Sequence, residues 1–132
     1  MTTYLLDADV LIALLTEDHV FHDVANQWFA RTDSVALCPI VEGALVRTIV
    51  RLGARAATAT DVLTAMHALD KVQFWPDDVS YAAASLRRVR GHKQVTDTYL
   101  AALARAHDGV LATLDKPLAD ADERVEFIGE PG

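Results

Sequence analysis

The 132-residue sequence predicts a single α/β domain, residues 1–132, with a four- to five-stranded parallel sheet flanked by helices in a three-layer fold. The first observation is the order of segments, because short apolar runs suited to buried strands alternate with longer segments of helical periodicity. The second is that no linker, internal repeat or low-complexity stretch divides the chain. The third is composition, because 52% hydrophobic and 23% charged residues are typical of a globular domain with its own core.

Each expected strand is a short apolar run that ends at a polar or turn-forming residue. The first run ends at Asp7, the third at Pro76 and the fourth at Asp115. The last run is expected to form an edge strand. The five runs are Tyr4–Leu6, Val35–Cys38, Val72–Trp75, Val110–Leu114 and Val125–Ile128.

The segments between these strands carry apolar residues at helical spacing. Pro39 suits the first turn of the third helix, and Gly53 suits its end. Asp77 or Asp78 is expected to cap the fifth helix, which Gly91 ends. The expected helices are Val10–Leu15, His19–Arg31, Pro39–Leu52, Ala59–Leu69, Val79–Val89 and a sixth that begins at Thr96 or Asp97.

Charge and cysteine content restrict the class of protein. A net charge of −7 argues mildly against a nucleic-acid binder, although local basic clusters could line a phosphate path if cations cover the carboxylates. The single cysteine, Cys38, excludes an internal disulfide and a cysteine metal site. No apolar run approaches the roughly 18–20 residues of a membrane span, and the N-terminus lacks signal-peptide features, so we expect a cytoplasmic protein. The basic clusters are Arg47, Arg51 and Arg55, and Arg87, Arg88, Arg90 and Lys93.

Four acidic residues are expected to meet at one edge of the sheet. Asp7 and Asp115 end strands one and four, and Glu42 lies in the first turn after strand two. Asp97 begins a helix that precedes strand four and runs antiparallel to it, so its first turn should lie at the carboxyl ends of the strands. Ligands bind at that edge in open parallel sheets. A charged residue there needs a partner, because burying an unpaired charge is costly.

Crowded carboxylates either hold protons or bind a cation. Oxygen ligands without cysteine favour a hard divalent ion, Mg²⁺ or Mn²⁺, and such an ion supports phosphoryl chemistry with an activated water. The same residue types also suit purely local structural roles. Asp97 could be a helix N-cap, Glu42 could stabilise a helix dipole, and Asp115 could begin a turn.

Four motifs follow one another along the chain: Leu5-Leu6-Asp7-Ala8-Asp9-Val10-Leu11-Ile12, Glu42 ahead of Leu45-Val46-Arg47, Thr96-Asp97-Thr98-Tyr99-Leu100-Ala101-Ala102-Leu103-Ala104, and Leu111-Ala112-Thr113-Leu114-Asp115. Together they resemble a PIN domain, and more narrowly the VapC-type toxins of bacterial toxin–antitoxin pairs. The resemblance covers nearly the whole chain, and the length and the order of the motifs agree with it.

The resemblance implies a Mg²⁺- or Mn²⁺-dependent endoribonuclease that cleaves transfer or ribosomal RNA and leaves 5′-phosphate and 3′-hydroxyl ends. It also implies a homodimer, and inhibition by a small VapB-type antitoxin whose C-terminal segment covers the cleft. By position, Asp7 and Asp97 would be the closest metal ligands. Asp115 would complete the metal shell, and Glu42 would orient a water or a second ion. Thr113 matches a hydroxyl position that hydrogen-bonds a carboxylate.

Asp9 departs from the family pattern, which often has Asn, Ser or Thr at that place. We expect Asp9 to cap the first helix, and the alternative is an extra negative charge that tightens metal binding. Arg47, Arg51 and Arg55 are spaced to share one face of the third helix if it extends that far. That face could contact RNA or an acidic antitoxin segment, or it could simply be solvated.

Two different functions are also compatible with parts of the sequence. A haloacid-dehalogenase-like phosphatase also opens with an apolar strand and an Asp-x-Asp motif, but its later Gly-Asp pair is missing here, since Leu114 precedes Asp115. The second alternative is a catalytically silent PIN fold that serves as a binding module. The presence of all four acidic positions argues against that alternative.

Overall fold

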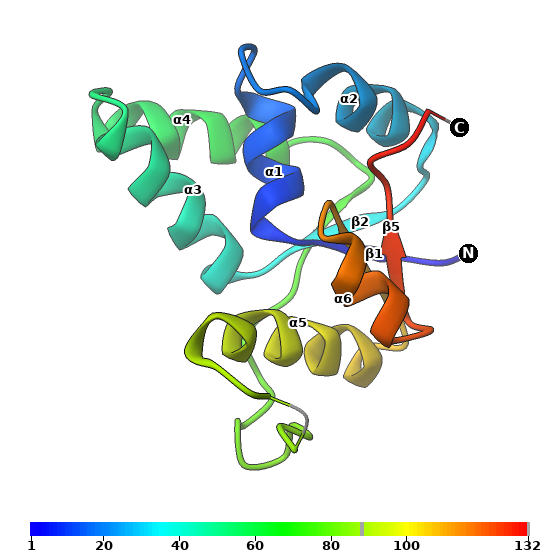
Figure 1. Cartoon of the computed structure of the whole chain (residues 1–132). Helices are drawn as coiled ribbons and strands as arrows, with labels where there is room; N and C mark the ends of the chain where they lie inside the picture. Colours follow the sequence, from blue (N-terminus) through cyan, green and yellow to red (C-terminus); the bar gives the residue numbers. More distant parts are fainter. Residues whose placement is uncertain (88, 132) are drawn as a thin grey trace.

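The computed structural model (Figure 1) describes residues 1–87 and 89–131. It contains five parallel strands in the order β3-β2-β1-β4-β5. Helices flank this sheet, so the predicted three-layer α/β fold is confirmed. The elements are β1 (Tyr4–Leu6), α1 (Ala8–Leu15), α2 (His22–Arg31), β2 (Val35–Leu37), α3 (Pro39–Arg51), α4 (Ala56–His67), β3 (Val72–Phe74), the 3₁₀ turn η1 (His92–Gln94), α5 (Val95–Ala106), β4 (Val110–Thr113), α6 (Lys116–Ala121) and β5 (Val125–Phe127).

The chain adds strands to the sheet in two opposite directions, and the order reverses between the neighbouring strands β1 and β4. From β1 it moves outward through β2 to the edge strand β3, and it then crosses back to β4 and β5 on the other side of β1. Crossovers between parallel strands are right-handed, so this reversal puts α5 on the opposite face from α1 and α3, as Figure 1 shows. The reversal point lies where ligands bind in open parallel sheets, outside the carboxyl ends of the strands.

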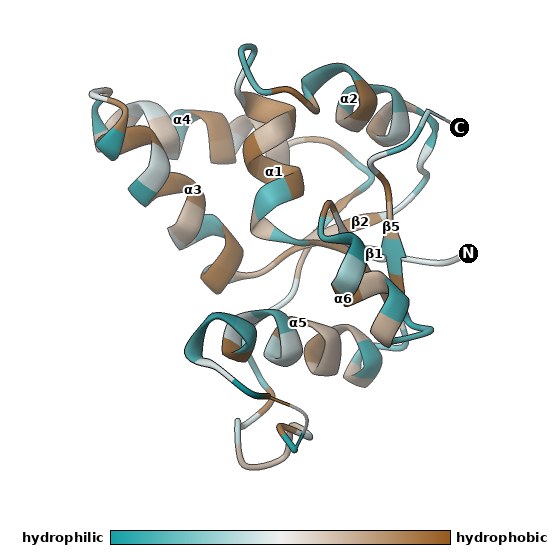
Figure 2. Cartoon of the chain, viewed as in Figure 1, coloured by the Kyte–Doolittle hydropathy of each residue, from teal (hydrophilic) through white to brown (hydrophobic). Residues whose placement is uncertain are grey.

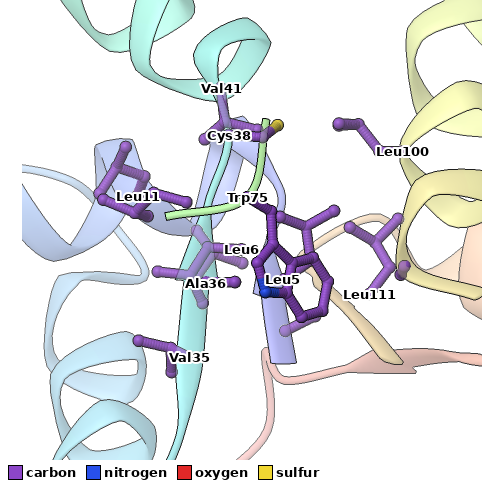
Figure 3. Close-up of a cluster of buried hydrophobic side chains, with 14 of the residues drawn as sticks. Leu5, Leu6, Leu11, Val35, Ala36, Cys38, Val41, Trp75, Leu100 and Leu111 are labelled. Atoms are coloured by element: carbon purple, nitrogen blue, oxygen red, sulfur yellow. The ribbon is translucent and has the colours of Figure 1, made fainter. Parts of the chain in front are cut away.

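The core lies on both faces of the central strands. Every residue of β2 is fully buried, which explains why this strand reads as a continuous apolar run. Side chains from the sheet, α1, α3 and α5 meet in the cluster of Figure 3, where Leu6, Leu11, Val41 and Leu100 are completely buried. Figure 2 shows that most of α1 is hydrophobic, with one hydrophilic band near its first turn.

The prediction of a helix at Val79–Val89 is wrong for residues 79–87 and for Val89. Arg88 lies outside the residues that the structure describes. Residues 79–87 form turns, in which the amides of Ala83 and Ala84 both donate to the Ser80 carbonyl. The Ser80 hydroxyl accepts from the Ala82 amide at 3.0 Å, which competes with helix formation. The hydroxyl of Tyr99 donates to the Val79 carbonyl at 2.7 Å. Because most side chains of the segment are exposed, no buried apolar face stabilises a helix.

One short helix, α6, is not among the expected helices. The remaining differences concern element boundaries. α2 begins at His22 rather than His19, and α4 spans Ala56–His67 rather than Ala59–Leu69. Gly53 follows the end of α3 with a φ of 96°, a conformation that favours glycine, as predicted. Among the described residues, no helix is both long and apolar enough to cross a membrane.

Candidate active site

Asp7 lies where β1 passes into α1, next to the reversal point of the sheet. It is the N-cap of α1, and its Oδ1 atom accepts a hydrogen bond from the Ala8 amide at 2.8 Å. Its own amide donates to the Ala112 carbonyl of β4 at 2.9 Å, which extends the pairing of the two strands. The residue is only 5% exposed. This carboxylate is therefore held rigidly at the carboxyl edge.

The Thr113 hydroxyl connects Asp7 with the end of β4. Thr113 is fully buried, and its Oγ1 atom donates to Asp7 Oδ2 at 2.7 Å. The same oxygen accepts from the Asp115 amide at 3.0 Å. Asp115 in turn caps α6, because its Oδ1 atom accepts from the Leu118 amide at 3.1 Å. The hydrogen bond expected of Thr113 is present, and it fixes two of the predicted site residues relative to each other.

The expectation that Asp9 caps α1 is wrong, since Asp7 occupies that position. Asp9 lies in the first turn, and both of its carboxylate oxygens accept from the Leu114 amide at 3.3 Å. Its Oδ2 atom is also 3.4 Å from the Thr113 hydroxyl. A hydroxyl has one proton, so the shorter contact to Asp7 is the stronger bond. Asp9 therefore belongs to the acidic cluster.

Asp97 reaches the same region from the other face of the sheet. It lies in the first turn of α5, and its side chain makes no capping hydrogen bond, because the N-cap of α5 is Gln94. Asp97 and Asp115 both line a small pocket of about 190 Å³, together with Gln94 and Leu118. The structure therefore brings Asp97 close to the end of β4, as predicted.

The charges of these carboxylates act on one another. Burial raises the pKa of Asp9 to about 7, and the negative charge of Asp7 contributes. Burial also raises the pKa of Asp97 to about 6, with added repulsion from Asp7 and Asp115. Burial raises the pKa of Asp7 as well, although its hydrogen bonds from Thr113 and Ala8 oppose the shift. The cluster thus favours protonation or a bound cation.

The chemistry of this cluster suits a hard cation, because every side-chain ligand that it offers is a carboxylate. Among the residues that the structure describes, however, no three His, Cys, Asp or Glu side chains are arranged to hold a metal ion as they stand. A shared ion therefore requires these side chains to turn toward one another. The half-buried Asp97 and Asp115 have more freedom to do so than the buried Asp7.

Glu42 makes a different contact from the aspartates. It lies in the first turn of α3, and its Oε2 atom is 2.5 Å from Nε2 of His67, at the end of α4. Sequence reasoning missed His67, because the two residues are 25 positions apart and the contact depends on how α3 packs on α4. Glu42 follows β2, next to β1, so it lies beside the aspartate cluster along the same edge.

The structure places only two of the three arginines Arg47, Arg51 and Arg55 on the predicted helix face. Arg47 and Arg51 are exposed on α3. Arg55 is not on that helix face, because α3 ends at Arg51 and Arg55 precedes α4 as its N-cap. Lys116 follows Asp115 but pairs with Asp120 at 3.4 Å, on the exposed side of α6.

Comparisons with known proteins agree with this geometry. The sequence profile of the PIN domain matches residues 4–124. The chain is 52% identical over 118 residues to Ribonuclease VapC29 of Mycobacterium tuberculosis, a match that covers 89% of each protein. Its fold resembles the crystal structure of Mycobacterium tuberculosis VapC20, a sarcin–ricin loop cleaving toxin, with a TM-score of 0.69, 17% identity and coverage of 89% and 94%. A toxin–antitoxin complex from Klebsiella pneumoniae matches with a TM-score of 0.66, 17% identity and coverage of 94% and 96%.

Proposed function

Because this chain belongs to the PIN-domain family, in its VapC-type branch, we propose that it is an endoribonuclease toxin whose activity depends on a bound Mg²⁺ or Mn²⁺ ion. The observation that carries the metal dependence is the cluster of Asp7, Asp9, Asp97 and Asp115, in which burial and mutual repulsion raise the pKa values of three members. A divalent cation relieves this repulsion and leaves the carboxylates ionised.

In this proposal Asp7, Asp97 and Asp115 hold the cation, and Asp9 adds negative charge beside them. When bound, the ion would polarise a phosphodiester oxygen and lower the pKa of a water molecule. Thr113 keeps Asp7 in place through the 2.7 Å hydrogen bond to Oδ2. This bond stabilises the ionised form of Asp7.

Glu42 has a separate role in the proposal, which is to orient water or a second ion beside the cluster. His67 fixes one oxygen of Glu42, so the other oxygen remains available to accept a proton or a hydrogen bond. The phosphatase alternative loses its basis, since the family profile that matches the chain is that of the PIN domain. The catalytically silent binding module remains to be tested by activity.

We also propose that a VapB-type antitoxin is the physiological partner, that the chain forms a homodimer, and that the substrate is transfer or ribosomal RNA. The antitoxin proposal is supported by the fold shared with a chain of the toxin–antitoxin complex from Klebsiella pneumoniae. The exposed Arg47 and Arg51 on α3 offer positive charge to RNA phosphates or to an acidic antitoxin segment.

The decisive experiment is RNA cleavage by the purified chain, free of antitoxin, with Mg²⁺, with Mn²⁺ or with EDTA. The products are mapped by sequencing the 5′ ends of the fragments. We expect cleavage only with a divalent ion, and a loss of at least about 1000-fold in Asp7→Asn and in Asp97→Asn, because a catalytic metal contributes several kcal/mol.

Asp61→Asn is the matched control, since Asp61 is an exposed aspartate on α4 and its replacement also removes one negative charge. Circular dichroism confirms that each variant is folded. Cleavage by Asp7→Asn at the wild-type rate would remove Asp7 from the site. Intact RNA under every metal condition would favour the silent binding module.

A further inference from the structure

A second pocket lies toward the β3 side of the sheet, and Glu42 is part of its lining. It is an open depression with a volume of about 380 Å³, lined by Glu42, Thr60, Leu63, Thr64, His67 and Phe74. Three elements form it: the first turn of α3, one face of α4 and the end of the edge strand β3. Its volume falls in the range of small-ligand sites, roughly 300–1000 Å³.

An exposed aromatic ring forms one wall of this pocket. Phe74 is the last residue of the edge strand β3 and is 52% exposed, although its one neighbour across the sheet, Leu37, is fully buried. Its ring meets the ring of His67 edge-on, with centroids 6.0 Å apart and an angle of 66° between the planes. The hydrogen bond to Glu42 holds His67 in turn. Contacts within the chain therefore hold the two aromatic rings that line the pocket, those of Phe74 and His67.

Hydroxyl groups of α4 supply the polar part of the lining. Thr60 donates its proton to the Ala56 carbonyl at 3.3 Å, and Thr64 donates to the Thr60 carbonyl at 2.9 Å. Each hydroxyl keeps lone pairs that can accept a hydrogen bond from a ligand. The pocket thus combines an exposed aromatic ring, the apolar side chain of Leu63 and two hydrogen-bond acceptors.

We propose that this pocket binds one unpaired nucleobase of the RNA substrate, next to the phosphate that is cleaved. The inference rests on the proposed ribonuclease function and names a recognition subsite for it. The base stacks on Phe74, and an exocyclic amino group donates to Thr60 or Thr64. Sequence-specific proteins read single-stranded RNA by stacking its bases on aromatic side chains and bonding their edges.

The position of the pocket supports this assignment. β3, β2 and β1 are neighbours in that order, so Phe74 and Asp7 end strands that are two places apart. With about 4.8 Å between strands, the two strand ends are separated by about 10 Å. Glu42 follows the strand between them. An RNA strand that runs along this edge can place a phosphate over the aspartates and the adjacent base against Phe74.

The lining is mostly apolar but also carries hydrogen-bonding groups, a combination that suits an aromatic base with polar edges. Glu42, His67 and the two threonines put hydrogen-bonding groups around the aromatic ring, which suits a flat ligand with a polar rim. Because the threonine hydroxyls act as acceptors, bases with an amino group are favoured. Uracil can donate only its ring N3–H and has no amino group, so it is expected to be the least preferred base at this position.

The test uses a pool of short single-stranded RNAs with randomised sequence, cleaved by the full-length chain with Mg²⁺. Sequencing of the fragment ends gives the base preference at each position around the cut. For Phe74→Ala we expect the preference at one position near the cut to disappear and KM to rise about 10-fold, with kcat little changed, because one base–aromatic stack is lost. Phe74→Trp should retain both the preference and the wild-type KM.

A second measurement is direct binding of a fluorescent RNA in EDTA, which does not depend on cleavage. Removing the base at the preferred position should weaken binding to the wild type about 10-fold and leave binding to Phe74→Ala unchanged. Leu52→Ala is the matched control, because Leu52 is a 69% exposed apolar residue outside the pocket. Its cleavage profile should equal that of the wild type.

An unchanged base preference and KM in Phe74→Ala would overturn the inference while cleavage by the wild type upholds the proposed function. A Phe74→Ala variant that binds RNA normally but loses affinity for its antitoxin would also overturn it, and would assign the pocket to a protein segment. If the wild type cleaves neither this pool nor transfer or ribosomal RNA in the presence of Mg²⁺, the proposed function fails, and the subsite fails with it.

Discussion

Replacing Asp9 by asparagine should stabilise the folded chain above neutral pH. Asp9 is packed beside Asp7 and Asp97, and burial together with these negative charges raises its pKa from 3.8 to about 7. Asparagine has nearly the same shape and keeps an oxygen that can accept from the Leu114 amide. The substitution therefore removes the charge with little change in packing.

The size and direction of the effect follow from the raised pKa. Between pH 3.8 and about 7 the folded chain keeps a proton on Asp9 that the unfolded chain has released, so stability falls as the pH rises through this window. Each pKa unit corresponds to about 1.4 kcal/mol, which gives about 4 kcal/mol for the rise from 3.8 to about 7. That is a large share of a typical unfolding free energy of about 5–15 kcal/mol.

Urea unfolding in EDTA at pH 5 and pH 8 measures the part of this difference that lies above pH 5, which is about 2 pKa units or about 3 kcal/mol. The wild type should be less stable at pH 8 than at pH 5, and Asp9→Asn should lose much of that dependence. Because the carboxylates titrate together, the residual slope belongs to Asp7 and Asp97. Saturating Mg²⁺ should restore stability to the wild type at pH 8. Equal stability of the wild type at both pH values would refute the crowding argument.

Two further substitutions test how the site is held. Thr113→Val removes the hydrogen bond to Asp7 Oδ2, so urea unfolding should show a loss of about 2 kcal/mol, and RNA cleavage should slow at fixed pH. Thr113→Ser should recover both properties, and failure of that recovery would contradict the role of the hydroxyl. Gly109→Ala would place a Cβ atom 2.7 Å from the Thr3 carbonyl oxygen and 2.7 Å from the Trp75 ring. The expected loss is about 1–3 kcal/mol, measured as a lower midpoint of thermal unfolding, and an unchanged midpoint would show that these neighbours can move.

Much of the arrangement of the candidate site could be predicted because it follows from strand order. Asp7 ends β1 and Asp115 follows β4, and the parallel pairing of these two strands brings their ends together. Asp97 could be placed because a helix that precedes a strand runs antiparallel to it. These inferences need only the order of the helices and strands along the chain. Errors of one or two residues at the boundaries of these elements do not change them.

The missed features depend on packing between elements that are distant in sequence. The contact of His67 with Glu42 needs the crossing of α3 and α4, which no local pattern encodes. The role of Asp9 was misjudged because Asp7 and Asp9 are both suitable caps by residue type, and only the backbone shows which one precedes the helix. The segment 79–87 has alanines that favour a helix, but too few of its side chains are covered by the rest of the chain.

The crowding of carboxylates at the end of β1 also has an evolutionary consequence. A substitution that neutralises one of them removes repulsion, so it can abolish activity while making the chain more stable. Under the proposed function, selection for survival of cells that produce this chain without an antitoxin should therefore enrich such neutral replacements over destabilising core mutations. The survivors would carry abundant, folded and inactive protein, still able to form the contacts with partners that lie outside the acidic cluster.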